Sequence, residues 1–471
     1  MNQPCPPQHS RNDGGTLKRR LENRHIQLIA ISGAIGTGLF MGSGKMIALS
    51  GASILLVYAI IGFFVFCIMR AMGEMLLANM EMASFAELVH HHLGPRAGFT
   101  LAWSYWLSWV VTAVGDVVVV AGFLQYWYPD LPTWMPAFGT LFLLLALNLL
   151  AVKAFGEVEF WFGLIKIIAI VALIITGVVM VATAYTSPDG VTASWHHLVE
   201  PGVMMPHGVM GFLAGFQIAI FSFVGTELIG TAAAEAHDPE TTLPKAINTI
   251  PMRILLFYVA ALACIISVIS WAHVPANRSP FVELFVLGGL PAAAGMINFV
   301  VMTSAASSAN SGVYSGSRML HGLSHNGQAP QPFGYLSRAG TPTNALVFSG
   351  LCMISALTLL FVIPDVMAVF TLVSTISAVM VIVTWSLILL SYFAYRRNHH
   401  DAHVRSTFKL PGGKFTAAVS LVFLIFVLCL LALEPDTRTA LYVMPVWYAA
   451  LLLAYRQVAK TAARQGIAAL S

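Results

Sequence analysis

Long apolar runs separated by short polar stretches recur along almost the whole of this sequence. A membrane-spanning helix needs about 20 mostly apolar residues. In lipid every backbone polar group has to be satisfied within the protein, so such runs fold as helices. We therefore predict an all-α integral membrane protein with twelve transmembrane helices, at about 25–45, 52–72, 98–128, 134–153, 158–184, 208–235, 250–271, 284–314, 344–363, 366–395, 415–434 and 439–457.

The charge content agrees with a membrane protein and excludes several other classes. Only 9% of the 471 residues are charged, against about 25% in soluble domains. The net charge of +4 is spread through loops, so no basic face for nucleic acid is expected. The N-terminal residues 1–18 are polar and contain no apolar core of a cleavable signal peptide. A lipid bilayer is the expected surrounding, and the oligomeric state is left open.

No cofactor or metal site is expected. The five cysteines show neither metal-ligand nor disulfide spacing. Two histidine clusters, at 90–92 and 399–403, lie in predicted loops without a partner motif. Adjacent histidines cannot all face one ion on a regular element, so these clusters do not predict a metal site.

Basic residues predict the orientation in the membrane. Lys and Arg concentrate in cytoplasmic loops, and most of the 24 lie in the two tails or in the loops that follow even-numbered segments. The opposite side carries only Lys45, Arg278 and Arg438, and Lys166 lies inside a segment. We therefore expect both tails, 1–24 and 458–471, on the cytoplasmic side.

The first apolar run contains a glycine-rich stretch, Ser32-Gly33-Ala34-Ile35-Gly36-Thr37-Gly38. Each glycine costs a helix about 0.5–1 kcal/mol relative to alanine, so we expect a break here. A helix that restarts after a break presents free N–H groups, which suit a carboxylate. The alternative is a glycine-rich face for close helix packing.

A second apolar stretch, 222–230, is also interrupted by glycine and carries a carboxylate, Glu227. Two broken helices at matching places in two halves are typical of the substrate site of a secondary transporter. Because each half has five segments, the second half enters the membrane in the opposite orientation. The sequence thus predicts a first inverted repeat at 25–184, a second at 208–395, and two further helices at 415–457.

Several motifs resemble the bacterial amino-acid transporter branch of the amino acid–polyamine–organocation superfamily. They are Asn23 to Ala30, Gly33 to Phe40, Met69 to Glu74, and Ala234-Glu235. The segments 155–162 and 304–313 are similar to those of carriers for D-serine, D-alanine and glycine. The resemblance covers residues 17–459 and implies a LeuT-type five-plus-five fold with broken helices 1 and 6. It also implies proton-driven uptake of small neutral amino acids, namely glycine, D-alanine and D-serine, with L-alanine as a weaker substrate.

The two breaks supply the candidate substrate-binding residues. Backbone amides of Gly36, Thr37 and Gly38 would meet the substrate carboxylate, and carbonyls near Ser32, Gly33, Phe221 and Val224 would meet its ammonium. The resemblance places Phe221 as an aromatic lid. Gly225 and Thr226 belong to the second break, where the Thr226 hydroxyl would favour a hydroxylated substrate. Polar residues at 307–311, Ser311 among them, and at 374–377 either line the site or bond helix to helix.

Three charged residues lie at membrane depth: Asp116, Lys166 and Glu227. Each costs about 2.5–3.5 kcal/mol at a helix centre, so each should be paired or functional. The resemblance places Lys166 where sodium-coupled relatives of the fold bind a cation, and we expect all three to take part in proton coupling or in static ion pairs. Paired acids or a nucleophile with its base, as an embedded enzyme needs, are not evident. An exchanger, a uniporter and a non-transporting amino-acid sensor remain as alternatives.

Overall fold

The computed structural model describes residues 35–80, 82, 84–150, 152–230, 238–337 and 340–464. Within these ranges every regular element is a helix, apart from one isolated bridge between Thr186 and Thr192. The all-α prediction is therefore confirmed. Ten helical stretches are long and apolar enough to cross a membrane: Gly42–Ala78, Pro95–Leu124, Glu159–Ala182, Gly208–Gly230, Pro239–Ile269, Pro291–His325, Thr343–Phe361, Val366–Asn398, Gly413–Leu433 and Pro435–Thr461.

Ten stretches are fewer than the twelve expected, and two features account for the difference. Residues 25–34 of the first expected segment lie outside the described residues, and the stretch Gly42–Ala78 joins the rest of that segment to the second. The helix Gly42–Ser50 ends inside this stretch at Gly51, whose φ of 58° is one that glycine adopts without strain. The fourth expected segment forms an apolar helix of 17 residues, Trp134–Leu150. The count of twelve stays a prediction.

The first part of the chain forms helices that run up to the second break. Their bounds are α2 Thr37–Phe40, α3 Gly42–Ser50, η1 Gly51–Ser53, α4 Ile54–Ala78, α5 Phe85–Leu93, α6 Pro95–Leu124, α7 Trp134–Leu150, α8 Val152–Ala182, η2 Trp195–Leu198, α9 Gly208–Ala219 and η3 Ile220–Phe223.

The remaining helices follow residue 238. Their bounds are α11 Pro239–Asn248, α12 Ile250–Arg253, the π-helical turn η4 Ile254–Ala260, α13 Ala261–Ile269, η5 Trp271–His273, α14 Pro280–Leu287, α15 Pro291–His325, η6 Gln331–Gly334, α16 Thr343–Leu357, η7 Thr358–Phe361, α17 Val366–Asn398, α18 His400–Arg405, α19 Gly413–Leu433 and α20 Pro435–Arg464.

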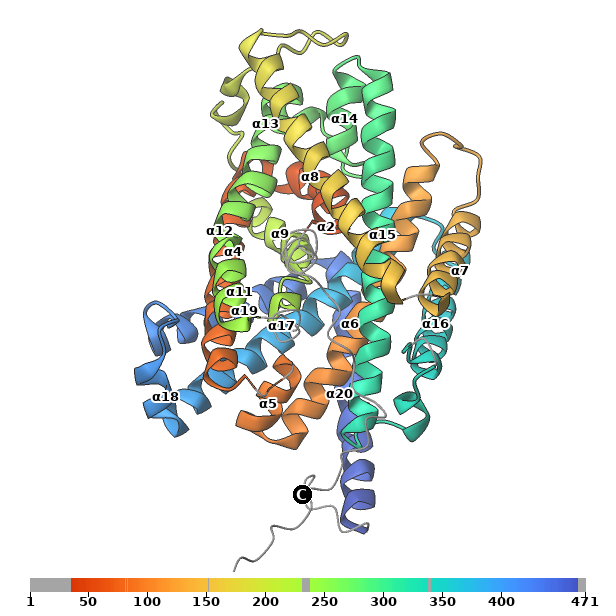
Figure 1. The fold of residues 1–471 in the computed structure, drawn as a ribbon. Coiled ribbons are helices and arrows are strands. Elements are labelled where there is room, and N and C mark those ends of the chain that lie inside the picture. The colour runs from red at the N-terminus through yellow and green to blue at the C-terminus, as the bar shows by residue number, and fades with distance from the viewer. Residues whose placement is uncertain are drawn as a thin grey trace, which may run out of the picture.

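Helix α6 packs against both α15 and α17 in the middle of the molecule (Figure 1). Small residues allow the close approach: a Cβ added at Gly312 of α15 would lie 3.1 Å from the Ala113 Cβ of α6. Polar contacts add to this packing, because the Ser377 hydroxyl of α17 lies 2.9 Å from that of Ser108 and 2.7 Å from that of Thr112. Small residues and interhelical hydroxyl contacts are how membrane helices associate.

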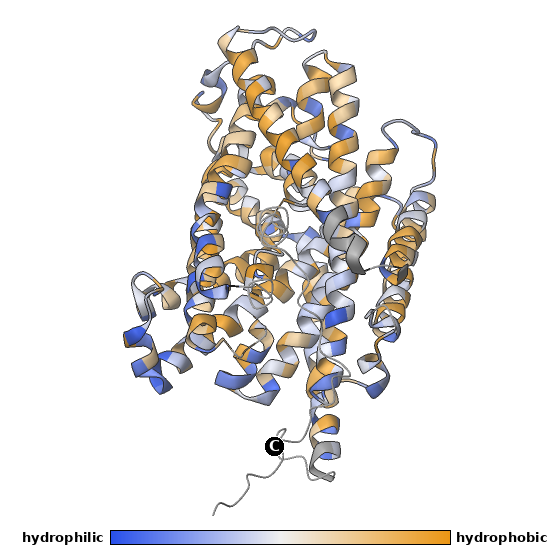
Figure 2. Ribbon diagram, viewed as in Figure 1, coloured by the Kyte–Doolittle hydropathy of each residue, from blue (hydrophilic) through white to orange (hydrophobic). Residues whose placement is uncertain are grey.

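The two ends of the molecule carry different elements (Figure 1). Helices α5 and α18 and the C-terminal end of α20 lie at one end, and α13 and α14 lie toward the other. Hydrophobic residues cover most of the long helices, while hydrophilic residues gather toward the end with α18 (Figure 2). The cytoplasmic orientation of this end, which carries α5, α18 and the C-terminal end of α20, stays a prediction.

Candidate functional site

At the expected first break, the described chain begins at Ile35 and the next residue is Gly36. Its backbone is extended, with φ −127° and ψ −166°, and α2 begins at the next residue, Thr37. The Gly36 carbonyl accepts the N–H groups of Leu39 and Phe40, at 3.2 Å each. Helix starts leave N–H groups without intrahelical partners, and here they belong to the residues expected to meet a carboxylate. Ser32 and Gly33, also expected in this site, lie outside the described residues.

The second helix break lies at Val224 and Gly225. The turn η3 ends at Phe223, Val224 has ψ 135°, and Gly225 has φ 95°. The Phe221 carbonyl accepts the Val224 N–H at 3.0 Å, which leaves one lone pair for a ligand. The Thr226 hydroxyl donates to the Phe223 carbonyl at 2.6 Å. That hydroxyl therefore serves the break itself, which weakens the expectation that it favours serine.

The two breaks touch each other at Gly38 and Ser222. A Cβ on Gly38 would lie 2.7 Å from the Ser222 Cα and 2.9 Å from its nitrogen, so only glycine fits there. Ser222 is held from two other helices, because Tyr258 donates to its carbonyl at 2.8 Å and the Tyr58 hydroxyl lies 3.1 Å from its Oγ. Residues 184 positions apart are thus joined into one region.

Phe221, the expected lid, is buried next to this contact. Its ring packs edge-on against Phe370 of α17, with centroids 5.8 Å apart, and it is 5% exposed. An aromatic pair of this kind contributes about 0.5–1.5 kcal/mol beyond area burial. The contact shows how the side chain is anchored, and its role as a lid stays a prediction.

Glu227 closes the second break. Its Oε1 accepts the Gly225 N–H at 3.1 Å, and its Oε2 accepts the indole N–H of Trp385 at 3.3 Å. Tyr105 of α6 lies beside the same carboxylate. A buried carboxylate that accepts backbone and indole donors fixes the geometry of the break. These contacts describe a structural clasp, and a proton-carrying role for Glu227 remains untested.

Asp116 lies against the first break. It is fully buried on α6, and its Oδ1 accepts the Thr37 hydroxyl at 2.5 Å. Ser308 of α15 and Lys166 of α8 are close enough to interact with the same carboxylate. The bond to Thr37 places this acid one residue from the extended Gly36.

Lys166 lies on α8 and is 2% exposed. Its Nζ donates to the Ser307 hydroxyl of α15 at 3.2 Å, and Ser307 donates to the Glu159 Oε1 at 2.9 Å. Asp116 and Glu159 both interact electrostatically with the ammonium. Ser311, expected at the substrate, lies beside Glu159.

Glu159 is the residue that the sequence interpretation missed. It is 3% exposed and lies on α8 with Lys166. A signal was present, because the two residues are seven positions apart and so share one face of a helix. The predicted segment boundary at residue 158 hid it, since an acid at the start of a span reads as a loop residue.

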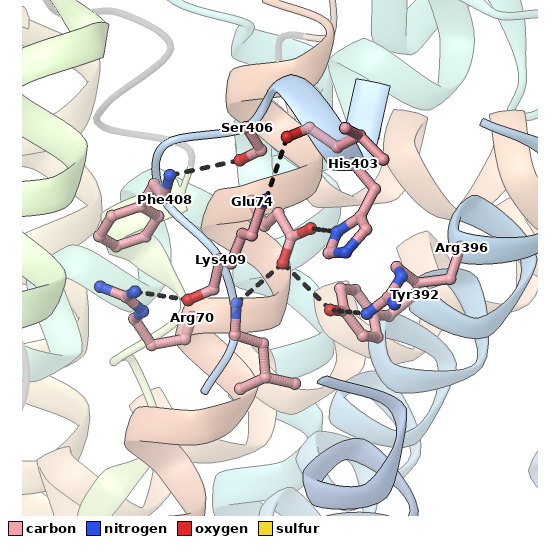
Figure 3. Close-up of polar contacts among 10 residues, drawn as sticks. Arg70, Glu74, Tyr392, Arg396, His403, Ser406, Phe408 and Lys409 are labelled. Atoms are coloured by element: carbon pink, nitrogen blue, oxygen red, sulfur yellow. Dashed lines mark hydrogen bonds and ion pairs between the residues drawn. The ribbon is translucent and has the colours of Figure 1, made fainter. Parts of the chain in front are cut away.

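A second polar cluster surrounds Glu74 at the α18 end of the molecule (Figure 3). The carboxylate is fully buried and accepts three donors: the Tyr392 hydroxyl at 3.0 Å, the Leu410 N–H at 2.8 Å and the His403 Nδ1 at 2.5 Å. One turn earlier, Arg70 donates to the Lys409 carbonyl. The motif at 69–74 therefore fastens the segment between α17 and α19 to α4.

The two histidine clusters meet in space. The ring centroids of His91, His92 and His399 lie 4.9–5.8 Å apart. In the described part of the chain, no group of three or more His, Cys, Asp or Glu is arranged to hold a metal ion. Burial, then the neighbouring His91 and His399, lower the pKa of His92 to about 4, so this imidazole is neutral near pH 7.

Comparison with known proteins identifies relatives along nearly the whole chain. The model of the family described as amino acid permease matches residues 25–467. The D-serine/D-alanine/glycine transporter of Escherichia coli strain K12 is 54% identical over 96% of each chain. The amino-acid permease AapA of Bacillus subtilis is 45% identical over 93% of this chain and 95% of its own. The aromatic amino acid transport protein AroP of Escherichia coli is 39% identical over 95% of this chain and 97% of its own.

Proposed function

Because this chain belongs to the amino acid permease family, we propose that it is a proton-coupled carrier that takes up small neutral amino acids. It is a multi-pass membrane protein, and its family and relatives are transporters rather than enzymes. The proposed substrates are glycine, D-alanine and D-serine, with L-alanine transported more weakly. The observation that carries this choice is the 54% identity to a D-serine/D-alanine/glycine transporter over 96% of the chain.

The geometry of the two breaks supports a zwitterionic substrate. The carboxylate would take the free amides of Gly36, Thr37 and Gly38 at the start of the helical stretch. The ammonium would take the second lone pair of the Phe221 carbonyl and the carbonyl of Val224. Phe221 would close over a small side chain, and Ser32, Gly33, Gly225 and Thr226 would complete the site.

The proposed coupling groups are Lys166, Asp116 and Glu227. Asp116 accepts the hydroxyl of Thr37 and interacts electrostatically with Lys166, so a proton gained or lost by this pair would change the electrostatic potential at the substrate carboxylate. Glu227 would act by keeping or breaking its hydrogen bonds with the Gly225 N–H and the Trp385 indole N–H at the second break. In this scheme residues 25–184 and 208–395 form the two inverted repeats, and 415–457 forms the last two helices.

The proposed membrane is the bacterial cytoplasmic membrane, with both tails inside. The concentration of basic residues in the tails and even-numbered loops supports this orientation. The end of the molecule that carries α5, α18 and the C-terminal part of α20 would then face the cytoplasm (Figure 1).

Competition against labelled glycine tests the substrate. Purified protein in proteoliposomes with an inward proton gradient should accumulate glycine, and D-serine and D-alanine should inhibit. Arginine, glutamate and phenylalanine should inhibit little. A profile led by aromatic or cationic amino acids would refute the substrate assignment. Counterflow without a gradient separates a carrier from a sensor that binds without moving substrate.

A further inference from the structure

Three ionisable side chains form one buried group between α6, α8 and α15. They are Asp116, Glu159 and Lys166, and each is at most 3% exposed. Hydroxyl groups join them to the helices around them: Thr37 donates to Asp116, and Ser307 lies between Lys166 and Glu159. Two acids and one base are an unbalanced set, and this imbalance limits how many protons the group holds.

The charge of this group is zero only when it binds two protons. With one proton, on Lys166, two carboxylates face one ammonium and a net negative charge is buried. Burying an uncompensated charge at membrane depth is expensive. The second proton therefore belongs on one of the two carboxyl groups, and it is the one that can be exchanged.

Both carboxyl groups have an oxygen that would accommodate this proton. In the part of the chain that the structure describes, the Asp116 Oδ2 and the Glu159 Oε2 are buried with no donor at hydrogen-bond distance, although the Ser308 and Ser311 hydroxyls lie beside these two carboxyl groups. An ionised oxygen in that position lacks the donors that a buried anion needs. A protonated one carries no charge, and its O–H can donate to the hydroxyl beside it, Ser308 for Asp116 and Ser311 for Glu159.

The Ser307 hydroxyl distinguishes the two acids. A hydroxyl both donates and accepts, and here it accepts from the Lys166 Nζ at 3.2 Å and donates to the Glu159 Oε1 at 2.9 Å. The same three atoms serve the reverse direction. When the Lys166 ammonium releases a proton and its Nζ becomes neutral, the proton of Glu159 leaves Oε1 for the Ser307 Oγ, while the Ser307 proton moves to Nζ. The products are a carboxylate, an unchanged serine and an ammonium, so charge and protons balance.

We propose that Glu159 shares the transported proton with Lys166 through the Ser307 hydroxyl. This inference rests on the proposed proton-coupled function and adds a residue and a relay to it. Loading the proton makes the buried group neutral, and releasing it leaves a net negative charge beside the first break. Asp116, held by Thr37 at 2.5 Å, remains the fixed anion that balances the Lys166 ammonium.

Glu159→Gln is the test variant, because it keeps the size of the side chain and removes its proton. The remaining Asp116 and Lys166 are then neutral together without an exchangeable proton. In proteoliposomes the variant should retain glycine counterflow and should lose glycine-driven proton entry, measured with a pH-sensitive dye inside the vesicles. Glu159→Asp should restore part of that proton entry.

Ser307→Ala tests the relay without changing charge. It should slow proton entry relative to counterflow. Ser317→Ala is the matched control, because Ser317 is a buried serine on the same helix whose hydroxyl, among the residues that the structure describes, donates to the Tyr314 carbonyl one turn away. It should behave as the unmodified protein does in both assays.

The possible failures are separable. If the unmodified protein moves glycine without protons, the proposed coupling fails and the inference falls with it. If the unmodified protein moves protons and Glu159→Gln moves them equally well, only the inference is overturned. Should Glu159→Gln aggregate on size-exclusion chromatography, Ser307→Ala decides: equal proton entry to the Ser317→Ala control overturns the relay, and slower entry supports it.

Discussion

Replacing Glu74 by alanine should destabilise the protein by several kcal/mol. The substitution removes the acceptor for three donors and leaves two of them, the Leu410 N–H and the Tyr392 hydroxyl, in a buried position. Each buried donor without a partner costs about 1–3 kcal/mol. The third donor, His403, is 15% exposed and can turn to water at little cost. The expected loss is therefore about 2–6 kcal/mol, summed over two donors.

Thermal unfolding of the purified protein in detergent measures this loss. The Tm of Glu74→Ala should be the lowest of the series, with Glu74→Gln between it and the unmodified protein because glutamine keeps one acceptor oxygen. Asp401→Ala is the control: Asp401 lies exposed on the neighbouring α18, and exposed substitutions change stability by about 0.5 kcal/mol or less. Equal Tm values for Glu74→Ala and Asp401→Ala would refute the reasoning.

Three further predictions follow from other parts of the molecule. Gly38→Ala should abolish glycine uptake, because the added Cβ would lie 2.7 Å from the Ser222 Cα. Gly139→Ala on α7 is the control and should retain uptake, because its added Cβ would have no atom within 4 Å. Equal uptake by the two variants would contradict the role of the Gly38–Ser222 contact. Between pH 6.5 and 4 the unfolded chain binds a proton at His92 that the folded chain does not. Stability should thus fall with acidification in this window, more steeply than in His92→Gln, and parallel Tm curves would count against this. On a cysteine-free background, a cysteine placed in 186–206 should react from outside and one in 398–408 only after permeabilisation; the opposite pattern would reverse the topology.

The helical class and the second break were predictable because their causes are local. A run of about 20 apolar residues forms a helix in lipid whatever surrounds it, and a glycine such as Gly36 or Gly225 weakens a helix at its own position. The number of spans was less certain, since the described part of the chain contains ten stretches that meet the length and hydropathy of a span. The turn at Gly51 and the short α7 show that local composition does not fix where a helix ends.

The side-chain partners depended on the tertiary structure. Glu159 and Lys166 share a helix face, which the sequence spacing contains, but the hydroxyl between them comes from Ser307, 141 residues from Lys166. The contact of Gly38 with Ser222 likewise joins two distant segments. Glu74 belongs to a recognisable motif, yet its donors lie on α17, α18 and the segment before α19.

The sequence by itself determined that this chain is a helical membrane protein, that its helix is interrupted at Val224 and Gly225, and which charges would need partners. Only the tertiary structure decided which residues are the hydrogen-bond and ion-pair partners of those charges. The physical reason is that apolar periodicity and glycine act within a few residues, whereas a buried charge is satisfied by whichever helix packs against it. In this protein α15 brings Ser307 to the acid and base of α8, and the packing of small residues between α6 and α15 holds it there.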